Sequence, residues 1–265
     1  MATDREVLRA TFDTAAAQYG DARPGYPDAL FADLIAETGV TPSAALLEIG
    51  CGPGTATIAL AGAGFAITAV ELGAAMAATA RRRLAEFPRV SVITSAFEQW
   101  DPGREVAFDL IYAATAWKWV DPTVKYERAA ALLRPGGHLA VWAADHAFPE
   151  GFDPFFTDIQ RVYDEIDERI PVWPPPPPDE RIDTTADEFV DSGRFEVTAS
   201  HRYLWSIDYS ADSYIALLDT FSGHIAMSPA KRGYLYREIR RRLAERPDDR
   251  VTRHWSATLT VGRRR

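Results

Sequence analysis

The residues best suited to chemistry lie in one short stretch of alternating glycines. Residues 46–56 read LLEIGCGPGTA, so an apolar run ends just after an acid, Glu48, and Gly50, Gly52 and Gly54 follow. Glycine adopts positive φ without steric cost and lets a ligand approach the backbone closely. The helical pattern after the glycines would offer unpaired N–H groups and the positive end of a helix dipole. The stretch predicts a strand, a tight loop and a helix that hold a nucleotide-like ligand with a carboxylate.

Two classes of ligand compete for such a loop. The NAD fingerprint is G-x-G-x-x-G/A, and Thr55 stands where its third small residue would be. The pattern is instead E-x-G-x-G-x-G, with Cys51 inside the loop, and it resembles motif I of the class I S-adenosylmethionine-dependent methyltransferases. A single glycine-rich loop is weak support, so the rest of the chain has to agree with it.

The second buried strand is predicted at 65–70, and it ends at Glu71, which Leu72 follows. In Rossmann-like folds an acid about 20 residues after the first loop glycine binds the ribose hydroxyls. Glu71 lies 21 residues after Gly50. The spacing therefore predicts that Glu71 binds a ribose.

Three further segments carry the resemblance. A third strand at 90–94 leads into Ala96, Phe97 and Glu98, where the methyltransferase family has an acid near the adenine amino group. A fourth strand at 108–112 and the sequence LLRPGG before a fifth strand resemble the family's later motifs. The resemblance covers residues 12–143.

The segment from Tyr19 through Arg23-Pro24-Gly25-Tyr26-Pro27 resembles the entry to small-molecule methyltransferases of the trans-aconitate and quinone-biosynthesis type. The resemblance implies that it closes over S-adenosyl-L-methionine, whose product is S-adenosyl-L-homocysteine; a plain Pro–Gly turn is the alternative. The cofactor-binding residues that we expect are Tyr19, Arg23, Glu48, Gly50, Cys51, Gly52, Gly54, Glu71, Leu72, Ala96, Phe97, Glu98, Ala113 and Ala114.

The expected fold is an α/β, Rossmann-like sheet of seven mostly parallel strands with an antiparallel last strand and helices on both faces. The first five strands read as nearly continuous apolar runs, as parallel strands buried on both faces should. We expect a single methyltransferase domain over residues 1–265. N-terminal helices occupy 1–40, and insertions at 146–193 and 208–248 form a helical cap over the site.

The composition of the chain limits the classes of partner that we expect. The net charge of −9 argues against a nucleic-acid partner. No apolar run reaches the ~18 residues of a membrane span, and the first residues lack a signal-peptide pattern, so we expect a cytoplasmic protein without membrane contact. No cysteine–histidine cluster has metal-binding spacing, so no metal is expected. The oligomeric state is left open.

Methyl transfer from a sulfonium needs mainly alignment and a dry cavity, with a base only where the acceptor must lose a proton. Residues 113–121 resemble the family stretch that lines the boundary between donor and acceptor, with Lys118 where relatives carry histidine. Trp117 is a candidate for the acceptor wall or for packing. His146, just after strand five, is the first candidate for a base, and His224 is the second.

The predicted function is methylation of a small molecule, with oxygen as the expected acceptor atom, in a capped pocket. An NAD-dependent oxidoreductase is the alternative among enzymes, and a non-catalytic S-adenosylmethionine-binding protein is the alternative outside them. The abundance of Trp, Phe and Tyr favours an apolar or aromatic acceptor.

Overall fold

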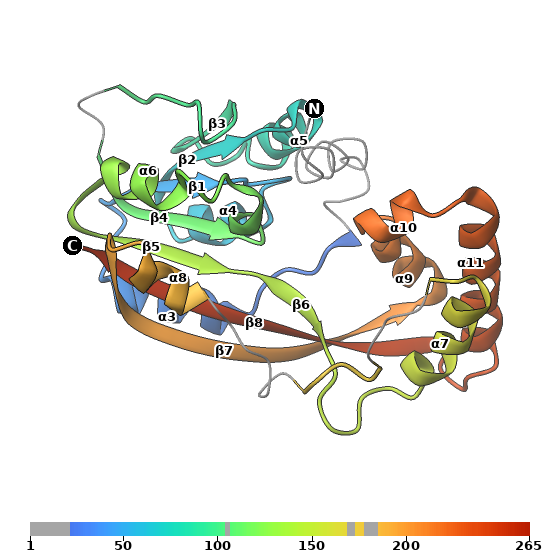
Figure 1. The fold of residues 1–265 in the computed structure, drawn as a ribbon. Helices are drawn as coiled ribbons and strands as arrows, with labels where there is room; N and C mark the ends of the chain where they lie inside the picture. The colour runs from blue at the N-terminus through green and yellow to red at the C-terminus, as the bar shows by residue number, and fades with distance from the viewer. Residues whose placement is uncertain (1–21, 104–106, 169–172, 178–184) are drawn as a thin grey trace.

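One twisted β-sheet organises the chain (Figure 1), in a computed structural model that describes residues 22–103, 107–168, 173–177 and 185–265. The sheet order is β3-β2-β1-β4-β5-β8-β6, and β7 pairs with β8 outside this path. The strands are β1 (Ala45–Ile49), β2 (Ala66–Glu71), β3 (Val90–Thr94), β4 (Phe108–Ala114), β5 (Leu133–Trp142), β6 (Ala144–Ala147), β7 (Phe195–Ser210) and β8 (Arg250–Arg264).

The predicted Rossmann-like α/β fold is confirmed. Strands β1 to β5 pair in parallel, and β8 runs antiparallel to β5, β6 and β7. The described residues contain eight strands where we expected seven. The additional strand, β6, arises because the chain continues extended after Trp142 and pairs with β8 from Ala144 to Ala147.

Helices cover both faces of the sheet. Side chains alternate along each strand, so Leu46 and Leu47 of β1 belong to different buried clusters. One cluster includes residues of α3 (Asp28–Thr38) and α4 (Thr55–Gly62), and the other includes residues of α6 (Lys125–Leu132) and α8 (Thr185–Asp191). Helix α5 (Ala74–Arg83) packs near β2 and β3.

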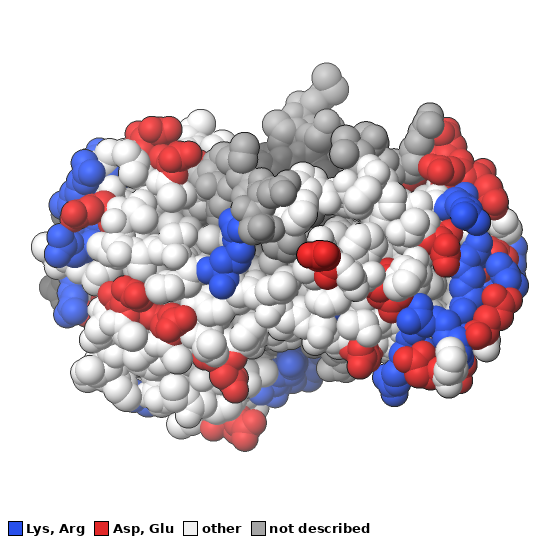
Figure 2. Space-filling view, turned by 90° about the horizontal axis from the view of Figure 1, so that it is seen from below, with Lys and Arg blue, Asp and Glu red and all other residues white. Residues whose placement is uncertain are grey.

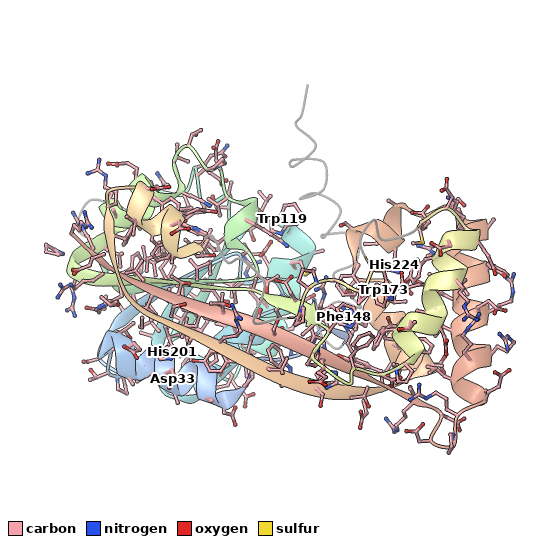
Figure 3. The ribbon with its side chains drawn as sticks, turned by 60° about the horizontal axis from the view of Figure 1, so that its bottom comes forward. Asp33, Trp119, Phe148, Trp173, His201 and His224 are labelled. Carbon is pink, nitrogen blue, oxygen red and sulfur yellow. The ribbon has the colours of Figure 1, made fainter. Side chains whose placement is uncertain are left out.

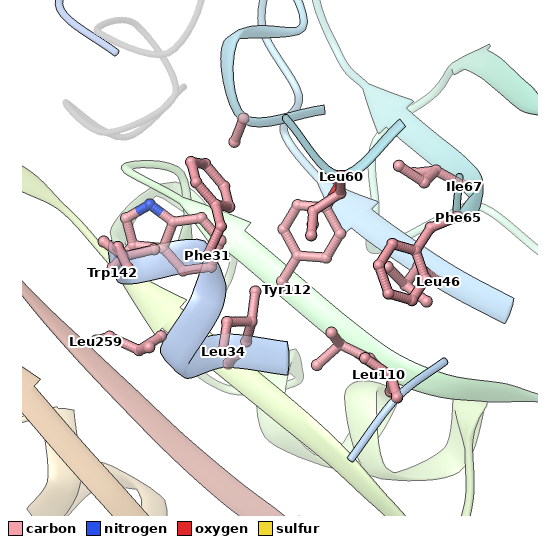
Figure 4. Close-up of a cluster of buried hydrophobic side chains, with 14 of the residues drawn as sticks. Phe31, Leu34, Leu46, Leu60, Phe65, Ile67, Leu110, Tyr112, Trp142 and Leu259 are labelled. Carbon is pink, nitrogen blue, oxygen red and sulfur yellow. The ribbon is translucent and has the colours of Figure 1, made fainter. Parts of the chain in front are cut away.

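The buried cluster beneath α3 shows how this helix is held on the sheet (Figure 4). Phe31 and Leu34 are buried against the sheet, and Phe31 meets Trp142 of β5 edge-on with ring centroids 6.1 Å apart. The Trp142 ring in turn stacks on Tyr112 of β4 at 5.7 Å. Helix α3 ends at Thr38, because Gly39 adopts the left-handed conformation at its C-terminus. The helix expected before residue 22 lies outside the described residues.

The cap forms at the far end of a long two-stranded ribbon (Figure 1). Strands β7 and β8 stay paired from Phe195–Arg264 to Ser210–Arg250, well beyond the edge of the parallel sheet. Four described helices lie on this extension, and all but the shortest contribute side chains to one buried cluster. They are α7 (Phe155–Glu165), α9 (Ala211–Leu218), α10 (Ser222–Ala226) and α11 (Pro229–Ala244).

Part of the segment 146–193, where we expected a cap insertion, lies on the main sheet. Helix α8, inside the predicted 146–193 insertion, packs on the main sheet instead of the cap. Phe189 is fully buried beside Phe195, and Lys125 of α6 forms an ion pair with Glu188 at 2.9 Å. Helix α8 is thus held on the main sheet by the contact of Phe189 with Phe195 at the start of β7. Among the described residues, no helix has the length and apolar character needed to cross a membrane.

The crossing of β8 with α8 yields a prediction about stability. A Cβ added to Gly262 would lie 2.5 Å from the Phe189 ring and 3.3 Å from Cβ of Phe195. Gly262→Ala should therefore lower the free energy of unfolding by about 1–3 kcal/mol through overpacking. The measurement is denaturant unfolding followed by circular dichroism.

Gly233→Ala is the matched control, because the nearest atom to its new Cβ would be the flexible end of Arg237 at 3.7 Å. Within α11 this change should stabilise the protein by about 0.5–1 kcal/mol. Equal stability of Gly262→Ala and the unchanged protein would contradict the packing of α8 on the sheet.

Candidate functional site

A cavity of about 540 Å³ opens at the carboxyl ends of β1, β2 and β4. The strand order reverses between β1 and β4, and ligands of open α/β sheets bind at this kind of switch point. Its far wall comes from the cap and the ribbon, and includes Phe221, Arg253 and Trp255. One cavity thus joins the glycine loop to the cap.

The glycine loop has the backbone conformation that only glycine adopts easily. Gly50, Gly52 and Gly54 have φ values of 67°, 53° and 86°. A Cβ on Gly50 would lie 2.5 Å from Cβ of Ala116, so this position also needs glycine for space. The loop after β1 and the loop after β4 therefore pack directly on each other.

Glu48 lies beneath the glycine loop as a buried acid. Its side chain is 1% exposed and accepts hydrogen bonds from the hydroxyls of Thr57 at 2.5 Å and Tyr112 at 2.8 Å. Burial raises the pKa of Glu48 to about 7, although both hydrogen bonds favour the charged form. The carboxyl thereby connects β1, α4 and β4 below the cavity, whose wall it also reaches.

Glu71 shapes the loop from its side. Its two carboxylate oxygens accept from the backbone N–H of Gly52 and Gly73, both at 2.8 Å. Glu71 lines the cavity, and its binding of ribose hydroxyls stays a prediction. Cys51 is 5% exposed, and burial raises the pKa of its thiol well above the usual value, which disfavours a nucleophilic role.

Most of the predicted cofactor residues gather at this cavity. The predicted residues that line it are Arg23, Glu48, Gly50, Cys51, Gly52, Glu71, Leu72, Phe97, Ala114 and His146. The predicted residues that do not line it are Gly54, Ala96, Glu98, Ala113, Trp117 and His224. Tyr19 lies outside the described residues. Glu98 instead accepts from the backbone N–H of Asp121 at 3.0 Å, which fixes the loop after β4.

Trp117 is a core residue in the structure. It is 4% exposed and meets Tyr126 of α6 edge-on at 5.2 Å, with Lys125 Nζ 5.3 Å from its ring. The short 3₁₀ turn η1 (Trp117–Trp119) directs Trp117 inward, and Lys118 and Trp119 line the cavity instead. Figure 3 shows Trp119 on the main body, across from the cap.

His224 is held inside the cap and away from the cavity wall. Its Nε2 is hydrogen-bonded to the Tyr163 hydroxyl at 2.9 Å. Burial lowers the pKa of His224 to about 4, so the ring is neutral at pH 7. This contact with Tyr163 joins α10 to α7, and Figure 3 shows His224 among the cap helices.

His146 does reach the cavity, from β6. It lies opposite Trp255 in the pairing with β8. Its ring is 4.0 Å from that of Phe148 and 4.6 Å from that of Phe156, so the imidazole sits in an aromatic surround. Phe148 also meets Trp173 edge-on at 4.9 Å, and Figure 3 shows both side chains.

Sequence reasoning missed the residues that β8 contributes. Arg253 and Trp255 line the cavity, and they alternate with outward residues on the face that also carries Val251 and Ala257. The sequence did carry one signal for this, because Arg253 is a charged residue on an otherwise apolar face of the predicted last strand. Tyr26 and Thr115 lie in segments that were expected near the site, but neither was named as a site residue. Their hydroxyls are 2.8 Å apart at the cavity wall, and Thr115 has a φ of 60°.

The buried acid yields a pH-dependent prediction. The folded protein holds a proton on Glu48 up to pH 7, whereas the unfolded chain releases it near the ordinary value of 4.5. Stability therefore falls as pH rises through this window. Glu48→Gln cannot titrate, so at pH 8 it should be more stable than the unchanged protein by up to about 3 kcal/mol.

Denaturant unfolding at pH 5 and pH 8 measures this effect, and the advantage of Glu48→Gln should shrink toward pH 5. The exposed control Glu86→Gln should change the free energy of unfolding by less than about 0.5 kcal/mol at both pH values. An advantage independent of pH would show that Glu48 is not protonated in the folded protein.

Comparison with known proteins gives one family and partial relatives. Residues 46–137 match the family described as "Methyltransferase domain". A trans-aconitate 2-methyltransferase of Delftia acidovorans is 36% identical over 119 residues, which are 43% of this chain and 43% of that protein. An uncharacterised methyltransferase of Mycobacterium bovis is 31% identical over 145 residues, 54% and 56% of the two chains. The chain thus matches about half the length of these relatives.

Solved structures share the fold over a greater length. A protein of Anaeromyxobacter dehalogenans, proposed to be a type II methyltransferase, has a TM-score of 0.65 at 23% identity, covering 91% of this chain and 97% of that one. A Haemonchus contortus N-methyltransferase structure that contains S-adenosylhomocysteine has a TM-score of 0.52 at 17% identity. It covers 98% of this chain and 60% of that one. At these identities the likeness concerns the fold.

Proposed function

Because residues 46–137 belong to the class I S-adenosylmethionine-dependent methyltransferases, we propose that this chain transfers a methyl group from S-adenosylmethionine to a small molecule. The observation that carries the proposal is the cavity, which runs from the glycine loop and Glu71 to an aromatic wall at Phe148, Phe221 and Trp255. Donor and acceptor sites of a transferase have to share one enclosed space.

The glycine loop and Glu71 fit the cofactor. The open space beside Gly52, where an added Cβ would meet no atom within 4 Å, suits the methionine end, and the Glu71 carboxylate suits ribose hydroxyls. The negative charge of Glu71 also suits a positively charged ligand. When bound, S-adenosylmethionine supplies a methyl group already activated by its sulfonium charge.

The chain's own residues then orient the acceptor and exclude water. Phe148, Phe221 and Trp255 give the acceptor end apolar walls, and a desolvated, aligned acceptor needs little further help. We propose oxygen as the methylated atom and His146 as an auxiliary group at the wall. We also propose that α7, α9, α10 and α11 act as the cap of a single domain.

A polyanionic acceptor does not suit the surface. The basic run on α11 is neutralised locally, because Arg241 and Arg242 pair with Glu238 and Arg240 pairs with Asp212. Figure 2 shows basic and acidic side chains interspersed at this end of the molecule. An NAD-dependent oxidoreductase is not favoured by the family match, and the non-catalytic alternative is separated by measuring turnover.

Calorimetry tests cofactor binding. S-adenosylmethionine should bind, and Glu71→Ala should weaken its affinity by about 1.5–3 kcal/mol, the contribution of a hydrogen bond to a charged group. Glu37→Ala, an acid paired with His201 on a remote surface, should leave the affinity unchanged. Binding of NAD without binding of S-adenosylmethionine would refute the proposed function.

Kinetics test the role of His146. Since the donor is already activated, His146→Ala should lower kcat less than about tenfold, or roughly 1.4 kcal/mol. His201→Ala is the control, because His201 pairs with Glu37 of α3 and does not line the cavity (Figure 3). A loss of 100-fold or more, with cofactor affinity kept, would instead make His146 a general base.

A further inference from the structure

We propose that Arg253 binds a carboxylate of the acceptor, so that the cavity selects small monocarboxylic acids with an apolar or aromatic body. The inference rests on the proposed function, because it names the acceptor class for the same cavity. It concerns the end of the cavity farthest from the glycine loop, where the ribbon and the cap meet.

Arg253 is a buried cation that no acid of the described residues neutralises. Its side chain lies on β8 and lines the cavity, yet the residue is only 5% exposed. Within the part of the chain that the structure describes, no carboxylate lies within ion-pair distance of it, and its Nε has no hydrogen-bond partner. Its guanidinium carbon lies 4.3 Å from the ring centroid of Trp255 and 5.2 Å from that of Phe221.

Such an arrangement is costly without a ligand. An arginine stays charged in proteins, and a buried charge is tolerated where it is paired or solvated. Burial lowers the pKa of Arg253, and the nearby Tyr214 hydroxyl offsets this only in part. Arg23 also approaches Arg253 closely enough to repel it. An anion entering the cavity would relieve both the desolvation and the repulsion.

Two further donors lie on the same face of the ribbon. Ile207 pairs with Arg253 and Trp205 with Trp255, so Tyr209, two residues along, shares the face of Arg253 and Trp255. The Tyr209 hydroxyl and the Trp255 Nε1 are buried and, among the described residues, make no hydrogen bond of normal geometry. Arginine and indole N–H groups only donate. The Arg253 Nε and the Trp255 Nε1 favour a ligand group that accepts, such as a carboxylate, and the Tyr209 hydroxyl can donate to it as well.

The charge balance favours a carboxylate over a phosphate. Arg23 already donates to Thr220 Oγ1 at 2.8 Å and to the Thr220 carbonyl at 3.1 Å, and it stacks 4.2 Å from the Phe221 ring. Arg253 is therefore the cation best placed to pair with a ligand here. One guanidinium matches the single charge of a carboxylate and its planar pair of oxygens.

The remaining wall defines the body of the acceptor. Phe148, Phe221 and Trp255 surround the space next to Arg253, so the part of the acceptor attached to the carboxylate has to be apolar. Aromatic bodies gain additional ring contacts there. A molecule with several carboxylates would place unpaired charges against these rings.

The test compares acids with their uncharged amides. Benzoate, phenylacetate, 3-phenylpropanoate and hexanoate, each with its primary amide, are titrated into the S-adenosylhomocysteine-loaded protein and followed by ligand-observed NMR. At least one acid should bind at least tenfold more tightly than its amide. Arg253→Met should weaken the binding of that acid 100-fold or more, and it should leave the affinities for the amide and for S-adenosylhomocysteine unchanged.

Arg237→Met is the matched control, since Arg237 also stacks on a ring, Tyr234 at 5.8 Å, but is exposed on α11. It should leave acid binding unchanged. Without ligand, Arg253→Met should keep or raise the melting temperature, whereas an arginine needed only for folding would lower it. A lowered melting temperature together with unchanged acid binding would overturn the inference.

The other outcomes are equally distinct. If the amides bind as tightly as the acids, or if no acid binds at millimolar concentration, the proposal that Arg253 binds a carboxylate is wrong. Tighter binding of phenyl phosphate or inorganic phosphate than of any acid would assign the site to a phosphate instead. If the unchanged protein binds neither S-adenosylmethionine nor S-adenosylhomocysteine, the proposed function itself fails; if it binds them but no acid, only this inference fails.

Discussion

The pairing of β8 with three other strands is the constraint on which the site depends. Its C-terminal half closes the parallel sheet against β5, its centre pairs with β6, and its N-terminal half continues beside β7 into the cap. Since side chains alternate along one continuous strand, the register at Leu139–Gly262 also fixes where Arg253 and Trp255 point. The wall at the cap end is thus positioned by the same hydrogen bonds that complete the sheet.

The cavity is polarised along its length. The charged Glu71 lies at the glycine loop, and Arg253 lies at the cap end. A positively charged donor and a negatively charged acceptor would each meet the opposite charge. Low dielectric surroundings strengthen both attractions, and the two ligands then also attract each other across the space between them. The arrangement favours bringing two charged molecules together over binding either of them alone.

The half of the site built from local sequence could be predicted. Alternating glycines need a loop conformation that few other residues adopt, and Glu71 follows from its spacing after Gly50, so both residues were placed at the cavity without a structure. Tertiary packing decided the rest. Trp117 is turned inward by a short 3₁₀ turn, and Arg253 joins the cavity only through a pairing that spans the chain. The directions in which the Trp117 and Arg253 side chains point cannot be predicted from neighbouring residues, because they depend on which elements pack together.

The position of β8 in the chain also orders the steps of folding. Its partners β5 and β6 lie more than a hundred residues earlier, and β7 ends forty residues before β8 begins. Contacts that close such long loops form late and slowly. During synthesis, β1 to β5 leave the ribosome before β8 does, with the cofactor loop among them. The edge of β5 stays unpaired until β8 arrives, and the arginine and tryptophan of the cap wall arrive in the same step.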